Sequence, residues 1–282
     1  MHASDPTSSL GPVWDDALLA NPHAAADKRA RVQRMFAAIA PSYDINNRLH
    51  SLWMDQRWRR RAVRLAELKA TDRVVDVACG TGDLTIEFLS RLSQLTAGAG
   101  LGLATTQVTG IDFTYEMLPI ARRKVIRAVE RDEEDDGDLV AVKRAIHFLN
   151  GDALALPLPD ASADVVSIAF GIRNVADPLA ALREFRRVLR PGGRVIVLEF
   201  SLPTNRVLRG LYNFYFRKVL PRTATWISRD KTGAYKYLPE SVNTFIGRGE
   251  MLEMMAKAGF ERAEAVPLTF GVCVCYRGVV PG

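Results

Sequence analysis

The amino-acid sequence predicts an α/β fold: a doubly wound, mainly parallel sheet with helices on both faces. The main observation is the stretch 73–84, in which a β-branched run enters a turn rich in glycine. Such a run is typical of a parallel strand that is covered on both faces. Downstream, short apolar segments alternate with amphipathic ones, which indicates parallel strands joined by right-handed helical crossovers. Two strand-like segments, 260–268 and 271–276, close the chain and predict an antiparallel last strand.

Length and composition favour one large domain. The chain has 282 residues, of which 48% are hydrophobic, enough for a sizeable core. Because residues 1–28 contain Pro6, Pro12 and Pro22 and little periodicity, we expect a loosely ordered leader there, followed by a single domain over 29–282. No apolar run of about 18 residues is present to cross a membrane. Neither a secretory signal nor a transit peptide is evident, so we expect a cytoplasmic protein.

The charge is basic and unevenly placed. The net charge of +6 and the pI near 9.4 would suit nucleic acid or an anionic membrane surface. Positive residues are concentrated at 57–64 and 206–222, between aromatic and aliphatic residues that form apolar stripes. No RNA-binding module accompanies them, so no nucleic-acid partner is predicted. We interpret the acidic run 131–138 as a solvated loop. Three cysteines and four scattered histidines predict neither a disulfide framework nor a metal site.

The N-terminal part of the domain is predicted to be helical. Apolar residues recur at helical spacing over 28–39, and Pro41 ends that pattern. A second helical stretch, in which Trp58 and other apolar residues lie among arginines, leads to the first strand. Residues 29–68 are therefore expected to form a helical cap on the sheet.

The glycine-rich turn after the first strand is the predicted cofactor cradle. Gly80 and Gly82 allow the backbone to turn sharply and to approach a ligand closely. A dinucleotide fingerprint requires a third glycine where this chain has Thr85, so that match is incomplete. The loop offers carboxylates such as Asp76 and no Lys or Arg, which favours a cationic ligand such as S-adenosylmethionine over a pyrophosphate. An ordinary strand-turn-helix corner is the structural alternative.

The elements after this turn place polar residues at the carboxyl edge of the sheet. Further strands are expected at 108–112, 146–149, 164–169 and 194–200, and helices at 84–92, 116–130, 178–189 and 249–258, with an insertion of uncertain order at 93–106. Asp83 is placed to cap the helix that it precedes. At the ends of their strands, Asp112 would meet ribose hydroxyls and Asp152 an adenine amino group.

Longer segments resemble one known family. One signature consists of Tyr43, Asp44, Asn47, Ser51, Asp55 and Trp58, and a second of 187–193 continuing to 199–201. Segments 170–175 and 237–242 match parts of the family that generic methyltransferases lack. Over about residues 30–278 the chain therefore resembles the ubiquinone/menaquinone biosynthesis C-methyltransferases. Asn46, Ala163 and the longer insertions at 93–106 and 131–142 depart from the usual pattern, but they remove no chemical group from the site.

The resemblance implies the Class I S-adenosylmethionine-dependent methyltransferase fold, a doubly wound seven-stranded sheet with the last strand antiparallel. It also implies methyl transfer from S-adenosylmethionine to a ring carbon of a prenylated quinol, from demethylmenaquinol to menaquinol in the last step of menaquinone biosynthesis. The methoxybenzoquinol intermediate of ubiquinone biosynthesis is an alternative acceptor. A methyltransferase for another substrate and a non-catalytic scaffold subunit are further alternatives.

The resemblance also assigns residues. The implied cofactor-binding residues are Asp76, Ala78, Gly80, Thr81, Gly82, Asp112, Asp152, Ala153 and Ala169. Arg173 and Asn174 are the implied catalytic pair. Arg173 would stabilise a phenolate or position a water that acts as base, with Asn174 orienting it; a charge pair with a neighbouring carboxylate is the structural alternative. Tyr43, Asp44 and Tyr237 would close over the substrate, although helix capping and core packing also explain the first two.

Residues 202–247 interrupt the alternation of strands and helices. Over 206–222 a broad apolar and aromatic surface is edged by arginines, which suits a prenylated substrate and anionic lipid head groups. We therefore expect a substrate- and membrane-facing insertion, and peripheral binding at the inner face of the membrane. A helix packed on the domain with snorkelling arginines is the alternative. The sequence leaves a homodimer open.

Overall fold

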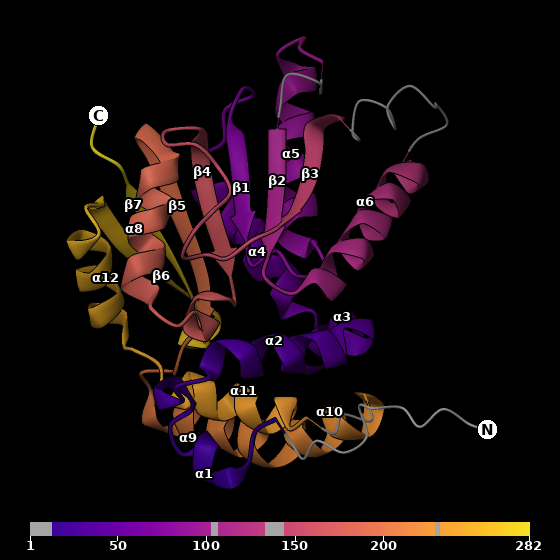
Figure 1. The fold of residues 1–282 in the computed structure, drawn as a ribbon, viewed down its shortest axis with the longest axis vertical. Coiled ribbons are helices and arrows are strands. Elements are labelled where there is room, and N and C mark those ends of the chain that lie inside the picture. Colours follow the sequence, from indigo (N-terminus) through magenta and orange to yellow (C-terminus); the bar gives the residue numbers. More distant parts are fainter. Residues whose placement is uncertain (1–12, 103–106, 133–143, 229–231) are drawn as a thin grey trace.

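The fold is centred on one seven-stranded sheet with the strand order β3-β2-β1-β4-β5-β7-β6 (Figure 1). The structure is a computed structural model and describes residues 13–102, 107–132, 144–228 and 232–282. The strands are β1 (Arg73–Val77), β2 (Gln107–Asp112), β3 (Ile146–Asn150), β4 (Ala163–Ala169), β5 (Leu189–Phe200), β6 (Glu261–Leu268) and β7 (Cys273–Val279). β1 to β5 pair in parallel, and β7 runs antiparallel between β5 and β6. The predicted sheet with its antiparallel last strand is confirmed.

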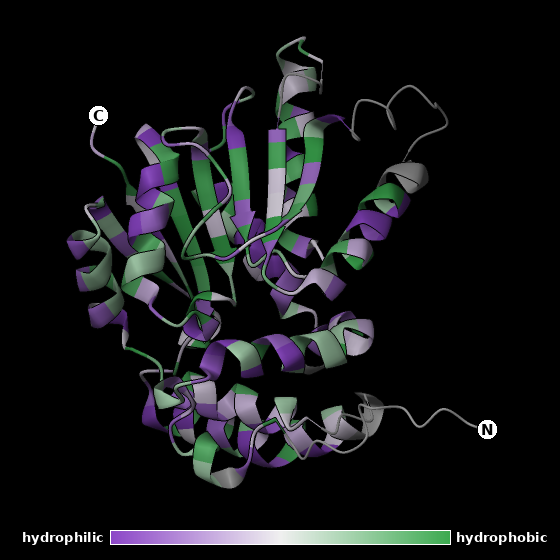
Figure 2. Cartoon of the chain, in the orientation of Figure 1, coloured by the Kyte–Doolittle hydropathy of each residue, from purple (hydrophilic) through white to green (hydrophobic). Residues whose placement is uncertain are grey.

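Helices cover both faces of the sheet. One face is packed by α4 (Met54–Leu65), α5 (Asp83–Gly98) and α6 (Leu118–Asp132), and the other by α8 (Pro178–Val188) and α12 (Arg248–Lys257). Figure 2 shows that the strands between these layers are largely hydrophobic, whereas polar residues appear on the helices. Phe88 of α5 and Phe185 of α8 are completely buried on opposite faces. The prediction of a doubly wound sheet, with helices on both faces, is confirmed.

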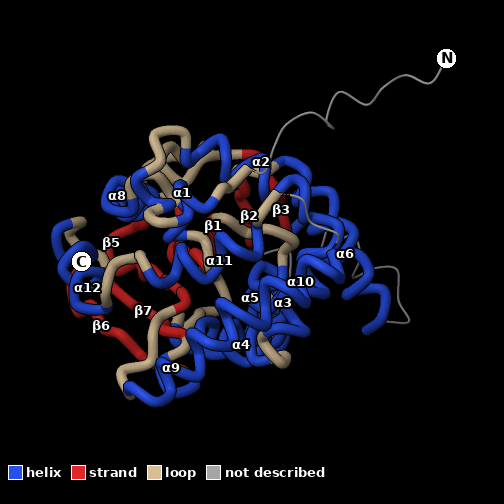
Figure 3. Tube along the Cα trace, turned by 90° about the horizontal axis from the view of Figure 1, so that it is seen from below, coloured by secondary structure: helices blue, strands red, loops and turns tan. Residues whose placement is uncertain are grey.

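A third, helical layer lies across the carboxyl edge of the parallel strands (Figures 1 and 3). It contains α1 (Asp16–Leu19), α2 (Lys28–Ile39), α3 (Tyr43–His50), α9 (Arg206–Phe214), α10 (Leu220–Ser228) and α11 (Ala234–Asn243). A π-helical turn, Tyr215–Val219, joins α9 to α10. This layer combines the beginning of the chain with the segment after β5, and the two share one apolar cluster.

Residues 13–28 differ from the loosely ordered leader that the sequence suggested. Residues 1–12 of that leader lie outside the described residues. From Val13 onward the chain packs on the helical layer, where the Trp14 ring stacks on Tyr237 with ring centroids 4.5 Å apart. The Trp14 backbone N–H also donates to the Thr232 carbonyl. Local periodicity does not predict this packing because the contacts of Trp14 are with residues more than two hundred positions away.

The helix after the glycine-rich turn is longer than expected and begins differently. It runs over Asp83–Gly98, so the first part of the predicted insertion 93–106 is helical. Gly82, with φ of 83°, occupies the N-cap, and Asp83 makes no cap; the prediction that Asp83 caps the helix is wrong. Its carboxylate pairs instead with Lys124 and lies near Arg59. Most of the acidic run 131–138 lies outside the described residues.

The packing of the N-terminal segment can be tested by truncating its anchor. Replacing Trp14, which is 2% exposed, by Ala should lower the free energy of unfolding by about 3–5 kcal/mol, because a large buried aromatic leaves a cavity. Trp53, at 59% exposed, is the matched control, and Trp53→Ala should change stability by less than about 0.5 kcal/mol. Urea denaturation of both variants measures the difference, and equal effects would contradict this packing.

Candidate active site

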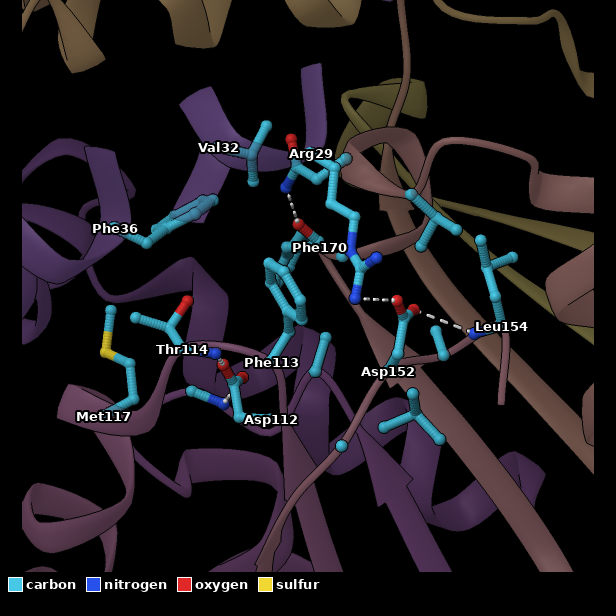
Figure 4. Close-up of a pocket in the computed structure, with 18 of the residues that line it drawn as sticks. Arg29, Val32, Phe36, Asp112, Phe113, Thr114, Met117, Asp152, Leu154 and Phe170 are labelled. Atoms are coloured by element: carbon cyan, nitrogen blue, oxygen red, sulfur yellow. Dashed lines mark hydrogen bonds and ion pairs between the residues drawn. The ribbon is translucent and has the colours of Figure 1, made fainter. Parts of the chain in front are cut away.

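A cavity opens where β1, β2, β3 and β4 end beneath α2 (Figure 4). We call it the cofactor cavity. Six of the predicted cofactor-binding residues line it: Ala78, Gly80, Asp112, Asp152, Ala153 and Ala169. These residues are brought together because the carboxyl ends of neighbouring parallel strands meet at the same edge.

The backbone around this cavity is shaped for close contact. Gly80 has φ of 55°, in the left-handed region that glycine adopts without strain. A Cβ on Gly171 would lie 2.7 Å from the Cβ of Ala78, so the loop after β4 can approach the turn after β1 only as glycine. On the side of the sheet the cavity wall therefore contains small residues, among them Ala78, Gly80 and Gly171, which leaves room for a ligand.

Asp112 ties two loops of the cavity together. Its Oδ2 accepts from the Gly80 backbone N–H and its Oδ1 from that of Thr114, each at 2.7 Å. Burial raises the pKa of Asp112 to about 6, although these hydrogen bonds oppose the shift. A carboxylate has about four acceptor positions, so it can still accept from the ribose hydroxyls of a nucleoside.

Asp152 is bridged to the helical layer by a residue that the sequence did not single out. Arg29, from α2, donates to Oδ2 of Asp152 at 2.9 Å, and its guanidinium lies 4.8 Å from the centroid of the Phe113 ring. Figure 4 shows Arg29 reaching down from α2 to Asp152, with Phe113 beside it. Helical periodicity predicts where Arg29 points relative to its own helix, but not its partner in the sheet.

Three other predicted cofactor residues do not line the cavity. Asp76 is buried in the sheet, where its carboxylate accepts from Thr85 Oγ1 at 2.6 Å and from Ser167 Oγ at 2.8 Å. Thr81 donates its hydroxyl to Asp44 at 2.5 Å. Gly82 begins α5. They hold the glycine-rich turn in place, and Asp44 takes part through Thr81 and through Lys124, 2.6 Å away.

A second cavity adjoins the first and reaches into the helical layer. We call it the acceptor cavity; its volume is about 310 Å³, against about 110 Å³ for the cofactor cavity. Phe36, Tyr43 and Phe170 line both cavities and so mark their junction. The remaining walls of the acceptor cavity are mainly apolar and aromatic side chains from α2, α4, β5, the π-helical turn and α11. Such a space suits a flat ring with an apolar substituent.

The predicted catalytic pair lies at this junction. Arg173 is buried and lines the acceptor cavity; its Nη1 donates to Glu199 Oε1 at 2.5 Å and to the Phe170 carbonyl at 2.8 Å. Asn174 lines the cofactor cavity and accepts from the Tyr237 hydroxyl at 2.8 Å. Arg173 therefore both pairs with a carboxylate, as the structural alternative held, and faces the acceptor cavity. Tyr237 lines the acceptor cavity and is joined to Asn174 by that hydrogen bond; its role toward a substrate stays a prediction.

This fold, together with a small-residue nucleoside cradle that offers carboxylates, defines a Class I S-adenosylmethionine-dependent methyltransferase. A solved structure supports the fold: the S-adenosylmethionine-dependent methyltransferase of Thermotoga maritima described as a possible histamine N-methyltransferase has a TM-score of 0.52 and 21% identity, over 87% of this chain and 98% of that chain. The chain belongs to the ubiE/COQ5 methyltransferase family, which matches residues 24–280.

Curated relatives cover nearly the whole chain. The demethylmenaquinone methyltransferase of Thermus thermophilus is 46% identical over 248 residues, 88% of this chain and 100% of the relative. The ubiquinone/menaquinone biosynthesis C-methyltransferase UbiE of Geobacter sp. is 40% identical over 256 residues, 91% of this chain and 99% of the relative. The family resemblance inferred from the sequence signatures is confirmed.

The raised pKa of Asp112 predicts how cofactor binding depends on pH. The ionised Asp112 carboxylate is predicted to accept the ribose hydroxyls, and a protonated one must first lose its proton. S-adenosylmethionine affinity should therefore be constant near pH 8 and fall as pH drops through about 6. Asp112→Asn should bind about tenfold more weakly or worse and lose this pH dependence. Calorimetry between pH 5 and pH 8 measures both.

Asp76 supplies the control, because burial also raises its pKa to about 6 but it does not line the cavity. Asp76→Asn should keep the pH dependence of affinity. A decline with falling pH that persists in Asp112→Asn would assign the effect to another group.

Proposed function

We propose that this protein transfers a methyl group from S-adenosylmethionine to a ring carbon of a prenylated hydroquinone, with demethylmenaquinol as the acceptor and menaquinol as the product. The observation that carries the proposal is the junction at Phe170 and Tyr43 between a nucleoside cradle and a larger apolar cavity that contains Arg173. The name of the Thermus thermophilus relative supports the menaquinone route.

A carbon nucleophile requires activation. When bound, S-adenosylmethionine supplies an electrophilic methyl group on a sulfonium. A hydroquinone ring carbon attacks well only once the neighbouring hydroxyl has lost its proton, so the site must favour the phenolate. Arg173 is suited to this role, since a buried guanidinium stabilises negative charge far more strongly than water does. It does not itself act as base because guanidinium stays protonated in proteins.

The partners of Arg173 hold it in position. Glu199 accepts from Nη1, and Nε lies 3.3 Å from Ser241 Oγ, while Lys28 Nζ donates to the Arg173 carbonyl at 2.9 Å. The contacts come from β5, α11 and α2, so three elements fix one side chain. Fixed geometry of this kind lowers the barrier because little reorganisation is needed during the reaction.

The second candidate acceptor is the methoxybenzoquinol intermediate of ubiquinone biosynthesis. The name of the Geobacter relative mentions both quinones and supports it. The two acceptors share the hydroquinone ring and the prenyl tail, and therefore the same demands on Arg173 and on the apolar walls.

An assay with both rings tests the function. Purified protein, labelled S-adenosylmethionine and a short-chain demethylmenaquinol should give a carbon-methylated product by mass spectrometry, and a short-chain methoxybenzoquinol should be methylated more slowly. The naphthoquinol ring should be preferred if the menaquinone route is the natural one. Methylation of neither ring, with cofactor binding intact by calorimetry, would refute the proposal and favour another substrate or a scaffold role.

We also propose that the protein binds peripherally to the inner face of the membrane through α9. Three large apolar side chains lie one to two turns apart on this helix and point to solvent: Val207 at 72%, Leu211 at 63% and Phe214 at 65% exposed. Arg217 and Lys218 follow them on the exposed surface. This combination is typical of helices that insert an apolar face between anionic lipids. None of the described helices is long and apolar enough to cross a membrane.

Membrane binding can be measured by vesicle sedimentation. Leu211→Ser combined with Phe214→Ser should weaken binding to anionic phospholipid vesicles at least about tenfold, since two buried apolar side chains contribute about 1.5–3 kcal/mol each. Leu149→Ser, an exposed position on β3 in another layer, should bind like the unmodified protein. Unchanged binding of the double variant, with its fold retained, would reject α9 as the membrane contact.

A further inference from the structure

The acceptor cavity has a second polar wall, separate from Arg173. It is formed by α4 and the turn before it, and Ser51, Asp55 and Arg59 line it. Asp55 is 3% exposed and is the one carboxylate among the described residues that line this cavity. Asp55 belongs to the first family signature, but neither the sequence nor the mechanism above gives it a role.

The contacts of Asp55 leave part of its carboxylate available. Oδ2 accepts from Arg59 Nη1 at 2.5 Å and from Gln56 Nε2 at 3.2 Å, and Oδ1 accepts from Ser51 Oγ at 2.8 Å. An ionised carboxylate has about four acceptor positions, so one remains, on Oδ1. The ion pair with Arg59 thus keeps the Asp55 carboxylate, with its Oδ1, at the wall of the acceptor cavity.

This pair reaches the junction of the two cavities. The Arg59 guanidinium lies 5.4 Å from the ring centroid of Phe170, and Phe170 lines both cavities. Tyr43, also at the junction, lies within electrostatic reach of both Arg59 and Arg173. A ring bound beside Phe170 would therefore meet Arg173 on one element and the Asp55–Arg59 pair on another.

The other polar groups of the cavity cannot easily accept a proton. Arg59 and Arg173 are permanently protonated guanidiniums. Burial raises the pKa values of the Tyr43 and Tyr237 phenols, which keeps them neutral. Glu199 is occupied by Arg173 and does not line the cavity. A proton released inside the acceptor cavity therefore has one carboxylate to go to among the described residues.

We propose that Asp55 is the proton acceptor for the quinol hydroxyl. This inference rests on the proposed function. The hydroxyl O–H bond breaks, its proton passes to Asp55 and its electron pair stays on oxygen, where Arg173 stabilises it. The ring carbon next to that oxygen then bonds to the methyl carbon, and the C–S electron pair leaves with sulfur. Loss of the ring C–H proton to water and return of the Asp55 proton to oxygen restore the aromatic ring, with one proton released overall.

The charges around Asp55 are balanced by further pairs. The charged side chains on the elements around Asp55 are Arg59 on α4, Asp83 on α5, Lys124 on α6, Asp44 and Arg48 on α3, and Arg173 after β4. Lys124 and Arg48 pair with Asp83, whose Oδ2 lies 3.8 Å from Arg59. Arg59 therefore remains the direct partner of Asp55, and Asp83 is a second carboxylate beside the same guanidinium that does not line the acceptor cavity.

The test compares Asp55→Asn with Asp83→Asn. Both substitutions remove a negative charge beside Arg59, but only the first removes a proton acceptor from the cavity. Asp55→Asn should lower kcat on the demethylmenaquinol by about 10²- to 10⁴-fold, with S-adenosylmethionine affinity unchanged. Its remaining rate should rise with pH in proportion to the ionised quinol. A fluorinated quinol with a more acidic hydroxyl should recover most of the loss, because it ionises without a base.

Two results would overturn the assignment and leave Asp55 as a structural partner of Arg59. One is an equal loss of kcat in Asp83→Asn; the other is a kcat of Asp55→Asn that does not depend on the acidity of the quinol. If Asp55→Asn does not fold, Ser51→Ala is the second variant: it removes the 2.8 Å hydrogen bond to Asp55 Oδ1 and a longer one, 3.4 Å, to the Arg48 carbonyl. It should still lower kcat several-fold, more for the parent quinol than for the fluorinated one. No change would overturn the proposal. Failure of the proposed function appears separately, as an unmodified protein that methylates neither quinol.

Discussion

The arrangement of the site depends on the buried ion pair between Arg173 and Glu199. A charge this deeply buried is strongly unfavourable unless its partner and its hydrogen bonds are in place. The pair joins the turn after β4 to the end of β5, and it lies beneath α2, whose Lys28 donates to the carbonyls of Arg173 and Val175. Because these groups need one another, the helical layer has essentially one position on the sheet. Both cavities follow from that position.

The sequence predicts the sheet well because its signals are local. The β-branched strand before Gly80, the strand-end position of Asp112 and the closing strands need only their own neighbours in the chain, and each lies where expected. The family signatures then point to Arg173. What the sequence does not indicate are pairings between distant elements. Arg29 with Asp152 joins residues on α2 and after β3, and no spacing along the chain marks that contact. The prediction for Asp83 is wrong for the same reason. A carboxylate at the start of a helix predicts a cap, but the Asp83 carboxylate pairs with a cation that is distant in the chain.

The sheet and the helical layer contribute different parts of the molecule. Solved methyltransferases at about 21% identity cover 87–88% of this chain, and that likeness extends to the fold alone. The acceptor cavity is lined by the helical layer together with α4, β5 and Arg173. The layer itself combines the beginning of the chain with the segment after β5. We therefore expect the choice of substrate to depend on these helices, whose sequence the sheet does not determine.

Helix α2 borders both cavities: Val32 and Phe36 line the one for the cofactor, and Met35, Phe36 and Ile39 line the other. One helix thus lines the binding places of two different ligands. A ligand that orders α2 lowers the entropic cost of ordering it for the other, so binding of the two should be positively coupled. Thermodynamic reciprocity requires the same factor in both directions: whatever the cofactor adds to quinol affinity, the quinol adds to cofactor affinity. After methyl transfer the same coupling would delay the departure of either product until the helix loosens.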